Sequence, residues 1–216
     1  MRREVSAMKN KSEISVMLKE AGILFAITLL SGLLLGVVYE VTKEPIRLQQ
    51  EKAVQEACKA VFPGSGDDIS FEVVDAKVSS ATVNDLAQNN VEIGTIYAAT
   101  ESGNFRGYVV ESVSAKGYGG KIVLYVGVSA DKTVGGVSIL ELKETAGLGM
   151  EAPNVLAPQF AGKRVESFVY TKTGAKEENE VDAISSATIT TKAVTNAVNG
   201  GLRVALELME GGAVNE

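Results

Sequence analysis

Hydroxyl-bearing side chains crowd into one short segment near the end of the chain. The segment runs from residue 182 to residue 192 and reads DAISSATITTK. An apolar pattern with helical spacing follows it, so the hydroxyls lie at a helix entrance, where unpaired N–H groups and the helix dipole favour an anion. The segment therefore predicts the binding of a phosphate-bearing ligand. Helix capping alone is the alternative, because Ser and Thr are preferred residues at helix N-termini.

Two glycine-containing segments earlier in the chain are further candidates for ligand contact. Residues 117–120 read GYGG, and residues 144–149 read ETAGLG. Glycine lets a ligand approach the backbone closely, but a plain turn explains the same residues equally well. Both segments interrupt stretches with strand-like patterns, so we expect them to be loops.

The residue types that are missing exclude several other chemistries. The chain has no His and a single Cys, Cys58. It therefore has no Ser-His-Asp or Cys-His nucleophile pair, no His ligand for zinc or haem, and too few thiolates for an iron–sulfur cluster. Redox work must use a bound organic cofactor, and no metal site is expected. Cys58 shares a helical face with Val54 and Val61, which indicates a buried small residue rather than a reactive thiol.

The order of residues in the hydroxyl segment carries a resemblance to a known family. D-x-x-S-S-A-T, ending at Thr188, closely resembles the acceptor motif of flavin transferases, D-x-x-[ST]-G-A-T, whose last Thr becomes bonded to the FMN phosphate. With the GYGG and ETAGLG segments, nearly the whole chain resembles the G subunit of the Rnf complex, an ion-translocating ferredoxin:NAD oxidoreductase. It is also similar to the C subunit of the sodium-pumping NADH:quinone reductase, but the compact length favours the Rnf protein.

This resemblance implies a set of FMN-binding residues. Thr188 is the expected covalent acceptor through a phosphoester bond, and Asp182 belongs to the motif that the transferase recognises or caps the preceding turn. The remaining expected contacts are those around the phosphate, Ser185, Ser186 and Ala187, and those near the flavin ring, Tyr118, Thr145, Gly147, Leu148 and Gly149. No catalytic residue is implied in this chain.

Two positions depart from the family pattern. Ser186 stands where the family usually has Gly, and Ala146 stands where it has Pro. Ser lacks the backbone freedom of Gly, and the loss of Pro leaves the loop less stiff before ligand binding. Neither change removes a reacting group.

The function implied by the resemblance is that of an electron-carrier subunit. Its partners are the other subunits of a membrane redox complex and a flavin transferase that attaches the FMN. Electrons from reduced ferredoxin would cross the FMN towards NAD while the whole complex exports Na⁺ or H⁺, with no turnover by this chain alone. The alternatives are a C-type quinone-reductase subunit, a membrane-anchored binding or scaffold protein without cofactor, and a stand-alone extracellular flavin reductase.

An apolar run near the N-terminus predicts an anchor in the lipid bilayer. Ala21–Tyr39 contains 19 residues without a charge, about the length that an untilted helix needs to span the hydrocarbon core. It is longer than a typical signal-peptide core and lacks a cleavage site. Basic residues favour a cytoplasmic N-terminus, with Arg2, Arg3, Lys9, Lys11 and Lys19 before the run and Lys43, Arg47 and Lys52 after it. The C-terminal domain is then extracytoplasmic.

The remaining patterns predict an α+β domain. Strand-like runs begin at Ile69, Val91 and Phe105, and a hairpin spans residues 121–142. A short helix is expected near residues 152–160, a strand near 165–170 and a terminal amphipathic helix at 190–209. We therefore expect helices packed on an antiparallel or mixed sheet. The expected parts are a cytoplasmic N-terminus (1–20), a transmembrane helix (21–39), a linker helix (40–66) and an FMN-binding domain (67–216), whose acidic balance gives no support for nucleic-acid binding.

Overall fold

The computed structural model describes residues 2–66 and 68–211, except for the side chains of residues 2–13 and 15. The chain divides into two compact units, Met1–Glu51 and Lys52–Glu216. The first helix, α1 (Arg2–Ala60), runs through this division. The boundaries expected at residues 20, 39 and 66 stay predictions. The side chains of Arg2, Arg3, Lys9 and Lys11, on which the expected orientation depends, lie outside the described residues.

Helix α1 carries the apolar segment that was expected to be a membrane anchor. Among the described residues it is the one helix that is long and apolar enough to cross a membrane, and its most apolar window is not buried against protein. The hydroxyls of Thr28 and Thr42 donate to carbonyls one turn earlier, on Leu24 and Val38. Both hydroxyls are thus satisfied within the helix, and for Thr28, inside the expected span, an apolar surrounding requires this.

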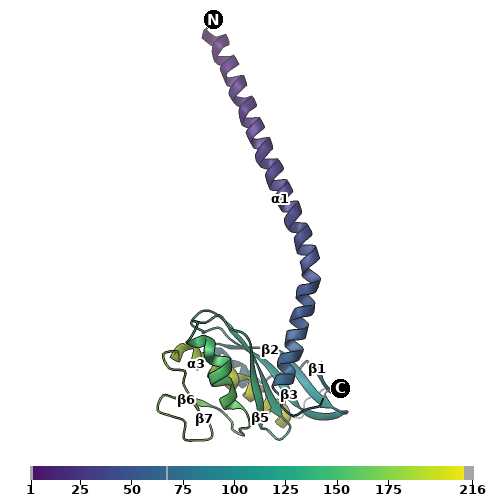
Figure 1. Ribbon diagram of the computed structural model, residues 1–216, viewed down its shortest axis with the longest axis vertical. Helices are drawn as coiled ribbons and strands as arrows, with labels where there is room; N and C mark the ends of the chain where they lie inside the picture. Colours follow the sequence, from purple (N-terminus) through teal and green to yellow (C-terminus); the bar gives the residue numbers. More distant parts are fainter. Residues whose placement is uncertain (1, 67, 212–216) are drawn as a thin grey trace. The chain divides into compact units, whose positions relative to one another are not determined.

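A five-stranded antiparallel sheet forms the centre of the second unit (Figure 1). Its strands follow chain order and are β1 (Ile69–Val73), β2 (Val91–Glu101), β3 (Asn104–Ser114), β4 (Ile122–Ser129) and β5 (Val134–Glu141). Valine, isoleucine and aromatic residues are frequent in these strands, which suits a pleated surface. Strand β4 is buried at every position except its last, so both of its faces are covered. The α+β class expected from the sequence is confirmed.

One face of the sheet is covered by the terminal helix α3 (Thr188–Gly211). Apolar side chains of α3 such as Val198 and Leu202 are fully buried in a cluster with Leu124 and Val126 of β4, which we call the α3 core. The helix lies very close to the sheet, because a Cβ atom on Gly201 would lie 2.8 Å from a methyl group of Val126. Glycine at this helix position therefore permits the close packing.

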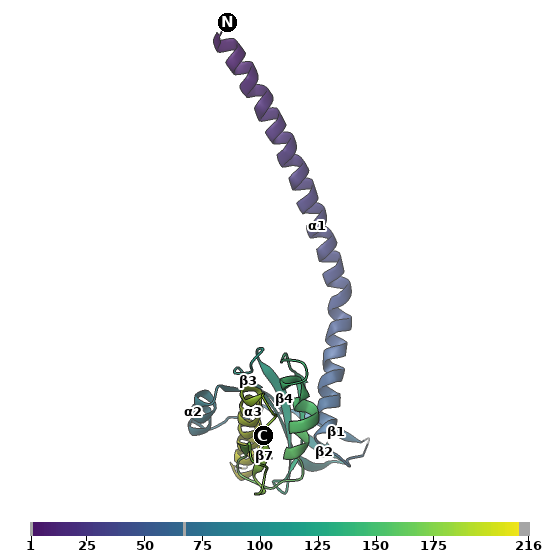
Figure 2. The same cartoon turned by 60° about the vertical axis from the view of Figure 1, so that its left-hand side comes forward.

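The other side of the sheet from α3 meets the end of α1 (Figure 2). A smaller cluster lies there, which we call the anchor-end core. It contains the last residues of α1 and the turn after it, together with residues of four strands, and its buried members are Ala57, Cys58, Val61, Phe62, Ile69, Ala99, Val109 and Tyr125. Burial raises the pKa of the Cys58 thiol to about 12, which keeps it protonated and unreactive at neutral pH. The expectation of a buried small residue is confirmed.

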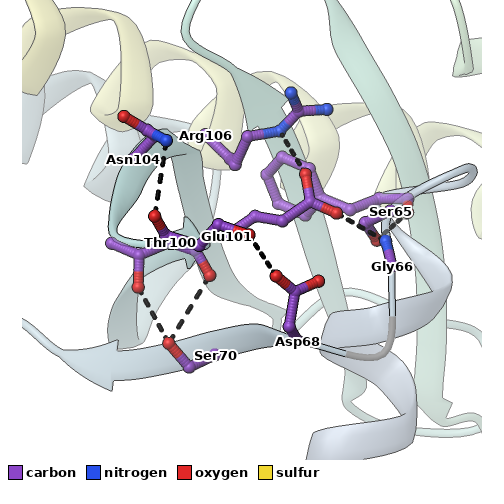
Figure 3. A network of polar contacts seen from close by, with 10 residues as sticks. Ser65, Gly66, Asp68, Ser70, Thr100, Glu101, Asn104 and Arg106 are labelled. Atoms are coloured by element: carbon purple, nitrogen blue, oxygen red, sulfur yellow. Dashed lines mark hydrogen bonds and ion pairs between the residues drawn. The ribbon is translucent and has the colours of Figure 1, made fainter.

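A polar network fixes the turn between α1 and β1 to the β2–β3 hairpin (Figure 3). The carboxylate of Glu101 accepts a hydrogen bond from the backbone N–H of Gly66 and pairs with Arg106 at 3.3 Å. On the same hairpin, Ser102 donates a hydrogen bond to Asp68. These contacts hold the end of α1 against the sheet.

Several smaller elements differ from the sequence expectation. Helix α2 (Ser80–Gln88) was not expected, because its Thr, Val, Asn and Asp residues are weak helix formers; an N-cap at Ser79 supports it. The expected strand near 165–170 is only β6 (Val169–Thr171), which pairs in parallel with β7 (Glu180–Asp182). The expected helix near 152–160 consists of three short helical turns, η1 (Gly149–Glu151), η2 (Ala152–Leu156) and η3 (Ala157–Phe160).

Candidate functional site

The hydroxyl segment forms a tight turn into α3. The N–H of Ile184 donates to the Thr191 hydroxyl at 3.1 Å, and that hydroxyl donates to the carbonyl of Ala187 at 2.9 Å. Helix α3 begins at Thr188, two residues earlier than expected, so Thr188 lies in its first turn. The N–H groups of this turn have no acceptor within the helix, and they can bind an anion.

Ser186 adopts a backbone conformation that L-residues rarely take. Its φ angle is 61°, which lies in the left-handed region. This is the position where the acceptor motif usually has Gly. Ser186 therefore carries a backbone strain that the usual glycine of the motif would not have.

A pocket of ≈ 430 Å³ opens at the start of α3. Its volume is within the usual range for ligand sites. The three segments singled out in the sequence meet here, although they are far apart along the chain. The lining residues are Tyr118, Glu144, Thr145, Leu148, Gly149, Ser186, Ala187, Thr188, Ile189 and Thr190.

Two residues expected at the site do not line this pocket. Ser185 is exposed next to it. Gly147 has a φ angle of 73° and lies in the turn that is closed by the bond from the Leu148 N–H to the carbonyl of Thr145. The turn explanation therefore accounts for Gly147 without a ligand.

Three lining residues, Glu144, Ile189 and Thr190, lie within the segments 144–149 and 182–192 but were not among the individual residues expected to contact FMN. Glu144 could have been found in the sequence, because it is the first residue of the ETAGLG segment. Ile189 and Thr190 follow the acceptor motif, and the expected helix start at residue 190 did not place them together in the first turn of α3.

Glu144 connects the three segments of the pocket. Its Oε2 atom accepts a hydrogen bond from the Thr190 hydroxyl at 2.8 Å, and its Oε1 atom accepts one from the N–H of Gly119 at 3.2 Å. The side chain is only partly buried. From the loop that follows β5, Glu144 thus contacts both α3 and the GYGG loop.

Asp182 lies outside the pocket and organises the preceding loop. Its Oδ1 atom accepts a hydrogen bond from the N–H of Ala175 at 2.7 Å. The side chain of Gln159 binds both the N–H and the carbonyl of Asp182. In the same loop, the backbone N–H groups of residues 176 and 177 lower the pKa of Glu180. This part of the motif is therefore a structural element as well as a candidate recognition residue.

A larger hollow of ≈ 830 Å³ lies elsewhere, beside α2 and the end of α3. Its polar groups already bind one another. Glu207 accepts hydrogen bonds from Ser79 and Thr82, and Arg203 pairs with Asp85 at 2.9 Å. Because these contacts hold α2 on α3, we assign this hollow a structural role.

The lining of the pocket at α3 combines two kinds of group. Ser186 and Thr188 supply hydroxyls beside the N–H groups of the first helical turn, and Tyr118, Leu148 and Ile189 supply aromatic and aliphatic side chains. Tyr118 and Ile189 are 70% and 54% exposed, so they can cover a flat apolar group. The arrangement fits a phosphate joined to a planar ring, as FMN has.

Comparison with known proteins identifies the family. Residues 117–203 match the FMN-binding domain family, and residues 8–61 match the RnfG N-terminal region. The chain is 33% identical over 201 residues to the G subunit of the Na⁺-translocating ferredoxin:NAD⁺ oxidoreductase complex of Acetobacterium woodii, covering 91% of this chain and 96% of that protein. The chain belongs to the RnfG family.

Other members differ in the ion that they are named for. The chain is 31% identical to the G subunit of the proton-translocating ferredoxin:NAD⁺ oxidoreductase complex of Clostridium ljungdahlii, covering 83% of this chain and 90% of that protein. As an RnfG protein with an apolar N-terminal helix, this chain is membrane-bound and carries an FMN-binding domain. The family resemblance expected from the motifs is confirmed.

Solved structures show the same fold in the C subunit of Na⁺-translocating NADH-quinone reductase. The protein from Parabacteroides distasonis superposes with a TM-score of 0.55 at 20% identity, covering 76% of this chain and 95% of that chain. NqrC from Shewanella oneidensis gives 0.52 at 17% identity, covering 74% and 99%. At these identities the similarity establishes the fold.

Proposed function

We propose that this RnfG protein carries electrons in an ion-translocating ferredoxin:NAD oxidoreductase through FMN bonded to Thr188 by a phosphoester. The observation that carries the proposal is the meeting of the GYGG, ETAGLG and acceptor segments around one pocket, with Thr188 in its lining. This pocket falls within the part of the chain that matches the FMN-binding domain family.

The residues of the pocket divide the work of holding FMN. Thr188 would supply the bonded oxygen, while the N–H groups of the first turn of α3 and the nearby Ser185 and Ser186 would hold the remaining phosphate oxygens. Tyr118, Thr145, Leu148 and Gly149 would position the ring. The bound flavin supplies one- or two-electron chemistry, and a link through its phosphate leaves the ring unchanged.

The anchor and the proposed bond suit an extracytoplasmic location. With the N-terminus in the cytoplasm, the FMN-binding domain would lie outside, where free FMN would diffuse away. A covalent link made by a flavin transferase prevents this loss. One membrane helix cannot form an ion path, so ion export and turnover belong to the assembled complex with its other subunits.

The test of the proposal is the mass of the protein after co-expression with a flavin transferase. We expect an FMN-sized increment on the tryptic peptide of residues 177–192, and in-gel flavin fluorescence after denaturation. Thr188→Ala should abolish both signals. Thr173→Ala is a matched control, because Thr173 is exposed and lies outside that peptide.

Two outcomes would contradict the proposal. Flavin that stays bound to denatured Thr188→Ala protein would place the link elsewhere. An unmodified wild-type mass in cells with an active transferase would instead favour a membrane-anchored scaffold without cofactor.

A further inference from the structure

A single carboxylate contacts all three segments of the FMN pocket. Glu144 belongs to the ETAGLG loop, its Oε2 atom is bound by Thr190 of α3 at 2.8 Å, and its Oε1 atom is bound by the N–H of Gly119 at 3.2 Å. Each oxygen thus has a different segment as its partner. These two hydrogen bonds explain the positions of Glu144, Thr190 and Gly119 without a ligand.

The glycines around Glu144 leave room for this carboxylate. A Cβ atom on Gly117 would lie 2.3 Å from the Gly120 carbonyl oxygen and 2.6 Å from Glu144 Oε1. A Cβ atom on Gly149 would lie 2.9 Å from Glu144 Oε2 and 2.6 Å from the Thr190 hydroxyl. Neither glycine has a positive φ angle. At Gly149 the atoms that a Cβ would meet belong to the bonded pair Glu144 and Thr190, whereas at Gly117 the backbone of Gly120 also excludes a side chain.

A third glycine brings the GYGG loop against the backbone beside Glu144. A Cβ atom on Gly119 would lie 1.7 Å from the carbonyl oxygen of Lys143, so no other residue could occupy this position without moving the loop. The loop that carries Tyr118 is thus packed against the residue preceding Glu144. The hydrogen bond from the Gly119 N–H to Glu144 holds the same two loops together.

The neighbouring lysines form no ion pair with the Glu144 carboxylate. Lys121 and Lys143 both pair with Glu141, at 2.8 and 3.3 Å. Among the residues whose side chains are described, Glu144 has no salt bridge. Its described partners are a hydroxyl and a backbone N–H, which fix a geometry through directional bonds.

We infer that Glu144 is a positioning residue for the flavin: it holds the Tyr118 loop and the first turn of α3 at a fixed spacing. This inference rests on the proposed attachment of FMN to Thr188. A phosphoester there fixes only one end of the cofactor, so the place of the ring depends on the loops around it. Pre-formed spacing reduces the ordering that attachment and ring binding require.

The inference predicts a difference between two substitutions at one position. Glu144→Ala removes both hydrogen bonds and should release the two segments. Glu144→Gln can keep them, because its amide oxygen accepts from Gly119 and its NH₂ group donates to the Thr190 hydroxyl. Glu141→Ala is the matched control, since it removes the same charge from a nearby carboxylate outside the pocket lining.

The first measurement uses the full chain without flavin, in the Thr188→Ala background, and records amide hydrogen exchange. We expect Glu144→Ala to speed exchange at Gly119 by about tenfold or more, with Glu144→Gln and Glu141→Ala close to the parent. Unchanged exchange at Gly119 in Glu144→Ala overturns the inference. It would do so whether or not Thr188 is the acceptor.

The second measurement uses the full chain with Thr188 intact, co-expressed with the transferase, and records flavin fluorescence anisotropy. Glu144→Ala and Thr190→Val should both lower the anisotropy, and the double variant should lower it no further than Glu144→Ala alone. Equal anisotropy in Glu144→Ala and wild type overturns the inference while leaving the FMN bond in place. Absence of flavin from wild type instead overturns the proposed function, and with it the positioning role.

Discussion

The two faces of the sheet are both packed closely through glycine, but the glycines lie on opposite partners. On the α3 face the helix lacks side chains at Gly200 and Gly201, so that side chains of the sheet and its surroundings can approach. On the other face the strands lack side chains at Gly127, Gly135 and Gly136, so that Val61 at the end of α1 can approach.

This difference follows from how much each helix can bury. Helix α3 has 24 residues and contributes many apolar side chains to its core, so it can omit two of them. The anchor-end core receives only the last turns of α1, and each side chain there matters more. We therefore expect the α3 face to tolerate added volume better than the anchor-end core.

Alanine substitutions on the two faces give the largest expected effect. Gly127→Ala places a Cβ atom 2.6 Å from the backbone oxygen of Val61, and should lower the free energy of unfolding by about 3 kcal/mol through overpacking. Gly201→Ala meets side chains instead, and alanine is a better helix former, so its loss should be about 1 kcal/mol. Chemical denaturation of the full-length protein in detergent measures both. Equal losses would show that the two faces tolerate crowding alike.

A smaller effect should come from pH, because the anchor-end core contains the buried Cys58. Its pKa is raised from 9.0 to about 12 in the folded protein, so folding stability is intact below pH 9 and falls as the unfolded thiol ionises. At pH 10 the loss should be about 1.4 kcal/mol. Cys58→Ala should remove this part of the pH dependence. Val198→Ala, in the α3 core, is the control, and should lower stability equally at pH 8 and pH 10.

The smallest effect tests the entrance of α3, where the cost is backbone strain. Ser186→Gly should raise the free energy of unfolding by about 1 kcal/mol, because glycine takes the left-handed conformation without a steric penalty. Ser185→Gly, at a neighbouring exposed position without a positive φ angle, should bring no gain. Denaturation midpoints of the two variants decide this. A gain at both positions would exclude backbone strain at Ser186 as the cause.

Much of this fold could be predicted from the sequence, because strong patterns mark its main elements. The five sheet strands, the apolar anchor and the terminal helix all have clear periodicity or β-branched runs. Helix α2 could not be found, since it depends on Ser79 and on Glu207, which is far away in the sequence. The parallel pair β6–β7 is too short for a pattern to form.

The site was predictable to the extent that motifs fix it. Thr188, Tyr118 and Leu148 line one pocket, and each belongs to a segment with a recognisable order of residues. Glu144 and Thr190 were missed because their role comes from a tertiary contact between residues 46 positions apart in the sequence. No local pattern encodes which oxygen meets which hydroxyl.

The contact of Val61 with the strand glycines also decides where a water-soluble fragment of this protein can begin. A gene truncated to start at Ser65 would omit Cys58, Val61 and Phe62 and leave an apolar patch on the sheet, which favours aggregation. A start at Lys52, where the second compact unit begins, retains this cover. The last turns of α1 should therefore be kept in any fragment made for secretion or crystallisation.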